Sequence, residues 1–210
     1  MNGRFETYAR PNIGFAAVET HDGQTIVIGG WPFAQFEDRK HDLEASYLSV
    51  FEAAPEFAAR LESARRESKI LGAVTPNFFR KPYGHGWALV GDAGYTKDPI
   101  TAQGITDAFR DAELLSAALS AVFAGSQSFE IALAAYQSAR DMQAMPMYEL
   151  TTMIATLEPP PPQMQQLLGA VHGNQEAMDG WCRMNAGITS PAEFLSDANV
   201  ARIFASAAAR

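Results

Sequence analysis

The chain has few cysteines, few basic residues and no long apolar run, and each shortage excludes a class of protein. Its one cysteine, Cys182, excludes an intrachain disulfide framework and a metal cage of several thiolates. The four histidines show neither HxxxH nor HExxH spacing, so no metal site is expected. Sixteen basic against 24 acidic residues give a net charge of −8, which disfavours nucleic acid or an anionic membrane as a partner.

No stretch approaches the roughly 18 apolar residues that a membrane-spanning helix needs. The opening segment, MNGRFETYAR, has no apolar core of the kind found in signal peptides. We therefore expect a soluble, cytoplasmic protein with no membrane partner. With 210 residues, 47% of them apolar, the chain is long enough to build one ordinary core or slightly more.

The first part of the chain is predicted to mix strands with helices. Two apolar, β-branched runs, IGFAAVE (13–19) and TIVIGG (25–30), flank an Asp22-Gly23 pair that tolerates the positive φ of a hairpin turn. An apolar stripe at three- and four-residue spacing predicts a helix over about 36–54. Pro55 suits the first position of a second helix, predicted over 55–69.

After a short buried strand at 87–90, the rest of the chain is predicted to be helical. The apolar periodicity predicts a helix over about 102–122, stopped by Gly125. Ser128 caps the next helix, which Pro146 must kink or end. Four prolines at 159–162 form a stiff spacer. Three short helices are predicted beyond it, at 163–172, 174–186 and 191–208. The predicted class is therefore helix-rich α+β, with antiparallel strands, one strand–loop–helix unit and a helical C-terminal region.

One segment, GWALVGDAGYTKDPITAQGITDAFRDAELL (86–115), carries the chemistry. It predicts a buried strand that ends in a turn with a carboxylate, Asp92, between Gly91 and Gly94. Gly104 begins the helix that follows, and a helix N-terminus offers free amides to an anion. From spacing alone, a ligand site competes evenly with a simple turn cap, because short motifs often match by chance.

The same segment resembles the second flavin-contacting motif of FAD-dependent monooxygenases of the p-hydroxybenzoate hydroxylase type. The resemblance rests on Gly91-Asp92-Ala93, Pro99, Gly104 and Asp111, which align without a gap. It implies that Asp92 accepts hydrogen bonds from the FAD ribitol and that Pro99 and Gln103 line the ring edge. The amides of Gly104, Ile105 and Thr106 would face the end of the ring that becomes anionic on reduction. Lys97-Asp98 departs from the family pattern, which has an apolar pair there.

The resemblance implies an oxidoreductase in which NAD(P)H reduces FAD. A flavin C4a-hydroperoxide would then hydroxylate a small organic substrate. It assigns no catalytic residue. It also implies three regions: a partial substrate domain (1–85), a flavin segment (86–125) and a helical C-terminal region (126–210).

Family members begin with a GxGxxG unit that binds the FAD pyrophosphate, and none of the 16 glycines here has that spacing. We therefore expect a C-terminal portion without the ADP-binding half, which binds FAD weakly alone and self-associates through the face left open. A flavin-dependent reductase of the same superfamily, a non-catalytic binding module and a helical small-ligand protein remain open as alternatives.

Overall fold

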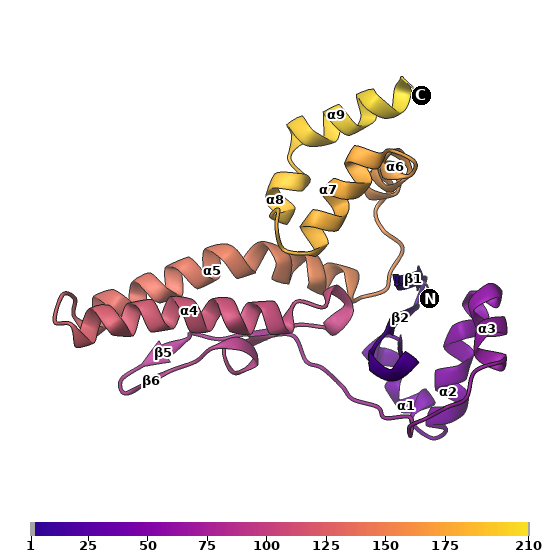
Figure 1. The fold of residues 1–210 in the computed structure, drawn as a ribbon, viewed down its shortest axis with the longest axis horizontal. Helices are drawn as coiled ribbons and strands as arrows, with labels where there is room; N and C mark the ends of the chain where they lie inside the picture. Colours follow the sequence, from indigo (N-terminus) through magenta and orange to yellow (C-terminus); the bar gives the residue numbers. More distant parts are fainter. Residues whose placement is uncertain (1–2, 210) are drawn as a thin grey trace. The chain divides into compact units, whose positions relative to one another are not determined.

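The computed structural model describes residues 3–209 and divides the chain into two compact units (Figure 1). One unit runs up to Val74 and also includes Ile154–Pro159. The other comprises Thr75–Met153 and the described chain from Pro160 onward. The chain is α+β and rich in helix, as the sequence predicts. Among residues 3–209, no helix combines the length and the apolar character needed to cross a bilayer.

The first unit is a three-stranded antiparallel sheet in the order β1-β2-β3, covered by short helices. Its elements are β1 (Phe5–Arg10), β2 (Ile13–Glu19), β3 (Thr25–Gly30), α1 (Phe36–Arg39), α2 (Leu43–Ser49) and α3 (Pro55–Glu62). Asp22 and Gly23 take positive φ values of 56° and 68° in the β2–β3 turn, which confirms the predicted hairpin. Strand β1 lies in the opening segment, where the sequence predicts no strand.

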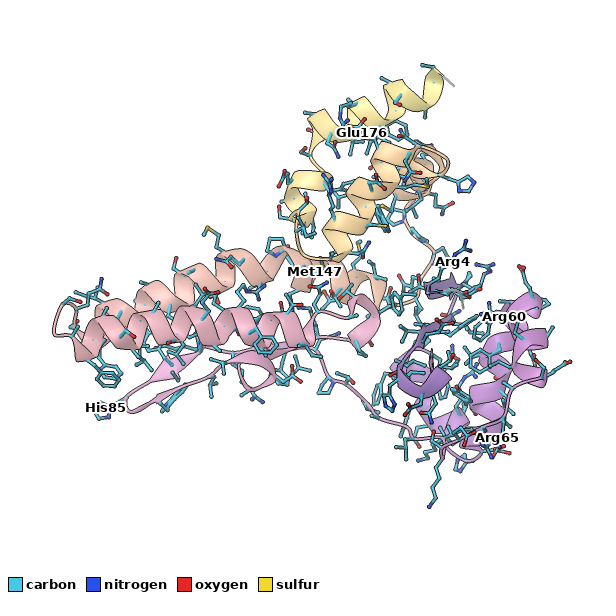
Figure 2. The ribbon with its side chains drawn as sticks, in the orientation of Figure 1. Arg4, Arg60, Arg65, His85, Met147 and Glu176 are labelled. Carbon is cyan, nitrogen blue, oxygen red and sulfur yellow. The ribbon has the colours of Figure 1, made fainter. Side chains whose placement is uncertain are left out.

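The core of this unit lies between strand β2 and the helices. Its buried members are Phe15, Ala17, Val50, Phe51, Ala54 and Phe57. The Tyr8 ring stacks on Phe15 at 4.3 Å and extends this core toward β1. At the edge of the core, Arg60 reaches from α3 to the Glu6 carboxylate of β1 at 2.8 Å (Figure 2 labels Arg60).

Two predicted helices in this unit are shorter than the sequence indicates. The helix predicted over 36–54 is broken between α1 and α2, because the Asp42 carboxylate accepts the Ala45 amide and starts a new helix. The helix predicted over 55–69 ends at Glu62. Beyond Leu61 only the small, exposed Ala64 continues the stripe, so a further helical turn would bury almost no apolar surface.

In the part of the chain that the structure describes, the second unit combines six α-helices with two short strand pairs. Strands β4 (Phe78–Phe79) and β7 (Tyr95–Thr96) pair with each other, as do β5 (Tyr83–Gly84) and β6 (Trp87–Ala88). The helices are α4 (Gly104–Phe123), α5 (Phe129–Ile154), α6 (Pro162–Val171), α7 (Gln175–Asn185), α8 (Pro191–Phe194) and α9 (Asp197–Ala208). Figure 1 shows α4 and α5 side by side in opposite directions.

Most helix boundaries of this unit follow the sequence signals, but the helix predicted over 191–208 is divided into α8 and α9 by the extended backbone at Ser196. Gly125 ends α4 with a φ of 71°, and Ser128 accepts the Ile131 amide at the start of α5. Pro146 lies inside α5, which does not end there. Buried side chains on both sides of it, including Met147 (labelled in Figure 2), hold the helix in place. The predicted strand at 87–90 is reduced to the two residues of β6.

Candidate functional site

The Gly91-Asp92-Ala93 segment forms a tight 3-10 turn that rests directly on helix α4. Gly91 has a φ of +54°, a conformation that other residues adopt only with strain. A Cβ at Gly91 would lie 2.9 Å from the Cβ of Ala108. Glycine is therefore required at position 91 both by its φ and by its contact with Ala108. The backbone of the turn packs directly against the first two turns of α4.

This packing brings Asp92 to the N-terminus of α4. The Asp92 Oδ1 atom lies 3.8 Å from the position that a Cβ on Gly104 would occupy. Asp92, Gly104, Ile105 and Thr106 are all exposed. Within the described residues, the N-cap Gln103 places no side-chain hydrogen bond on the first-turn amides. A carboxylate acceptor and a helix N-terminus therefore face solvent at one place.

The loop that leads to α4 is held by its own polar side chains. Asp98 accepts the Ile100 amide at 2.9 Å and begins the 3-10 turn Pro99–Thr101. Burial raises the pKa of the Asp98 carboxyl, and the Ile100 hydrogen bond opposes that effect. Pro99 is exposed, whereas the Gln103 side chain is buried and donates to the Asn185 carbonyl. Only the backbone of Gln103 thus remains available to line a ligand.

A cluster of four charged side chains lies beneath this site. Lys97 pairs with Asp107, and both side chains are only 5% exposed. Arg110 Nη2 donates to Asp107 Oδ1 at 2.9 Å and to the Tyr95 hydroxyl at 2.6 Å. The Gly91 amide donates to Asp111 Oδ2 at 3.1 Å. We call Lys97, Asp107, Arg110 and Asp111 the charged cluster.

Burial perturbs the ionisable groups around this cluster. It raises the pKa of the Asp111 carboxyl, while the Gly91 amide and nearby arginines lower it. Burial likewise raises the pKa of the Tyr95 hydroxyl, and the negative charge of Asp107 adds to that effect. These groups fix the turn to α4 and do not face solvent, so they are supports for the site.

Helix α5 supports the turn from its other side. The Tyr136 hydroxyl donates to the Leu89 carbonyl at 2.6 Å, and burial raises its pKa to about 12. Arg140 is fully buried, and its guanidinium lies 4.6 Å from the ring centre of Phe79 and 5.6 Å from that of Tyr95. Its Nη2 atom donates to the Arg80 carbonyl at 2.9 Å.

The structure thus brings together most of the residues that the flavin resemblance singles out. Asp92 and the segment Gly104–Thr106 are adjacent, and Gly91 joins the turn to the helix. Their roles toward a cofactor stay predictions. The sequence does not predict that Lys97 and Asp107 form a buried ion pair. The one available signal is the three-residue spacing of Asp107 and Arg110, which suits an ion pair on one helix face.

The chain shares its fold with PqsL, a probable FAD-dependent monooxygenase from Pseudomonas aeruginosa. A PqsL structure in complex with 2-aminobenzoylacetate aligns with 84% of this chain and 47% of its own, at a TM-score of 0.55 and 19% identity. A second PqsL structure covers 96% of this chain and 47% of its own, at a TM-score of 0.51 and 17% identity. This chain therefore spans about half the length of PqsL. No protein-family model and no curated protein matches the sequence.

Proposed function

We propose that this chain provides the flavin-contacting part of an FAD-dependent monooxygenase. The observation that carries the proposal is the approach of the Asp92 carboxylate to the N-terminus of α4, 3.8 Å from the Cβ position of Gly104. The likeness of the fold to PqsL supports the class of cofactor. The small organic substrate is supported in the same way by the 2-aminobenzoylacetate bound to PqsL.

The exposed groups fit the ring and the ribitol of FAD. Asp92 is an acceptor for ribitol hydroxyls, and a hydrogen bond to an ionised acceptor is among the strong ones. The free amides at Gly104–Thr106 suit a carbonyl oxygen or a developing negative charge. Glycine at position 104, which is exposed, leaves room for a ring to approach the backbone. Pro99 adds an exposed apolar surface next to them.

When bound, FAD would supply the redox chemistry, which is electron transfer from NAD(P)H and the activation of oxygen for hydroxylation of the substrate. This chain's own residues bind and orient. Asp92 would hold the polyol, and the α4 amides would stabilise the negative charge of the reduced ring through fixed dipoles in the right place. We assign no proton-transfer residue.

Titration with FMN tests the proposal, because FMN carries the ring and the ribitol without the adenosine. We expect amide chemical shifts of Gly91, Asp92 and Gly104–Thr106 to move on FMN addition. The variant Asp92→Ala should weaken FMN binding about tenfold, the loss of one charge-assisted hydrogen bond. Glu113→Ala is the matched control, since Glu113 is an exposed acid further along α4. Shift changes elsewhere on the chain, or equal affinities for the two variants, would refute the proposed site.

A further inference from the structure

Lys97 is a buried cation whose partner lies in the first turn of α4. Its ammonium pairs with Asp107, and Arg110 holds the other oxygen of the same carboxylate. Asp107 is the only acid in that first turn. The pair therefore lies at the end of the helix where the proposed ligand contacts, the amides of Gly104–Thr106, are exposed.

An acid at this position works against an anionic ligand. The N-terminus of a helix carries a partial positive charge, which a carboxylate in the first turn offsets. Charges act more strongly here than at the surface, because the pair is shielded from water. The cluster balances two cations, Lys97 and Arg110, against two anions, Asp107 and Asp111. Loss of Lys97 leaves it one negative charge in excess, and loss of the Asp107 charge leaves it one positive charge in excess.

We propose that Lys97 is a positioning residue that neutralises Asp107 and so keeps the α4 N-terminus favourable to the reduced, anionic flavin ring. This inference rests on the proposed function. Two-electron reduction of the ring with uptake of one proton gives that anion, whereas the oxidised ring is neutral. A charge beneath the helix therefore changes the affinity for the reduced form more than the affinity for the oxidised form.

Removal of the Lys97 charge lowers stability, because it breaks a buried pair, but it leaves the other hydrogen bonds of the charged cluster in place. In Lys97→Met, Asp107 keeps its hydrogen bond from Arg110, and Asp111 keeps the Gly91 amide. The methionine side chain fills a similar apolar volume. In Asp107→Asn, the side chain keeps its shape and its acceptor oxygen. Each variant thus changes one charge and few contacts.

The test compares the Kd of oxidised FMN with that of dithionite-reduced FMN, measured without oxygen at mildly alkaline pH from the amide shifts of Gly104–Thr106. For Lys97→Met we expect the preference for reduced FMN to fall about tenfold, which corresponds to a midpoint potential lower by about 30 mV for a two-electron couple. Asp107→Asn should move the preference in the opposite direction. The double variant should return close to wild type, and Lys97→Arg should retain the wild-type ratio.

The exposed Lys81 provides the matched control, since Lys81→Met removes a cation from the same unit outside the cluster. A merely structural role would weaken both redox forms equally and leave their ratio unchanged in every variant. Unchanged ratios, or shifts of the same sign for Lys97→Met and Asp107→Asn, overturn the inference. If wild-type protein shifts none of these amides with FMN, the proposed function itself fails, which is a separate result.

Discussion

Replacement of Gly91 by alanine should lower the free energy of unfolding of the second unit for two separate reasons. The φ of +54° costs a non-glycine residue about 1–2 kcal/mol. The new Cβ would also lie 2.9 Å from the Ala108 Cβ, and overpacking of this kind costs about 1–3 kcal/mol. We therefore expect Gly91→Ala to lower the free energy of unfolding by about 2–5 kcal/mol.

Gly125→Ala is the control that separates the two causes. Gly125 has a φ of +71°, but nothing lies within 4 Å of its Cβ position. The free energy of unfolding of this variant should fall by only about 1–2 kcal/mol, because it suffers the conformational strain without the contact. Replacing glycine by alanine also reduces the conformational entropy of the unfolded chain. This effect is the same in both variants, so it cancels when their free energies of unfolding are compared.

Urea unfolding followed by far-UV circular dichroism, and by the fluorescence of Trp87 and Trp181 in this unit, measures both variants. A second change, Ala108→Gly, removes the opposing methyl group and should recover part of the loss in the Gly91→Ala background. The coupling in this double-mutant cycle should be about 1 kcal/mol or more. Equal losses for Gly91→Ala and Gly125→Ala, or no coupling to Ala108, would refute the close approach of the turn to α4.

Two further predictions concern the charge and the strain around the same site. Burial raises the pKa of Asp111 above its unfolded value of about 3.9, so the native state binds the proton more tightly. The Asp111 carboxyl therefore stabilises the fold at pH values below its unfolded pKa, and this stabilisation is lost as pH rises through its folded pKa. We expect the free energy of unfolding of wild type, relative to that of Asp111→Asn, to fall as pH rises through this range. Urea unfolding from acid to neutral pH measures the difference. Ala102 is exposed and has a φ of 54°, which glycine adopts without strain. We therefore expect Ala102→Gly to raise the free energy of unfolding by up to about 1 kcal/mol. Ala124 has right-handed backbone angles, so the control variant Ala124→Gly should lower the free energy of unfolding. The first explanation would be contradicted if the stability of wild type relative to Asp111→Asn rose with pH. The second would be contradicted if Ala102→Gly and Ala124→Gly changed the free energy of unfolding in the same direction.

Local signals in the sequence account for the elements that the structure confirms. The β2–β3 hairpin follows from two β-branched runs around Asp22-Gly23, and the end of α4 follows from Gly125. Each of these signals acts within a few residues. The break at Asp42 was also within reach of the sequence, since aspartate is a favoured N-cap residue.

The contacts beneath the candidate site depend on long-range packing, which no local pattern reports. Lys97 meets Asp107 across a loop, and Gln103 meets the Asn185 carbonyl from 82 residues away. The sequence marks Lys97 only as a departure from an apolar family position. Its partner follows from how the loop folds back onto α4. The approach of Asp92 to Gly104 could be anticipated because the resemblance covers both positions in one segment.

The charged cluster explains how a small turn holds the position of a 20-residue helix. The turn offers α4 little apolar surface, since glycine at position 91 meets alanine at position 108. Small side chains allow the turn and the helix to approach closely, but they interlock little and so do little to stop the helix from sliding along the turn. The hydrogen bond from the Gly91 amide to Asp111 is directional, and the Lys97–Asp107 pair ties the following loop to the first turn. Buried ion pairs add little net stability, so their value here lies in fixing where the α4 N-terminus stands relative to Asp92.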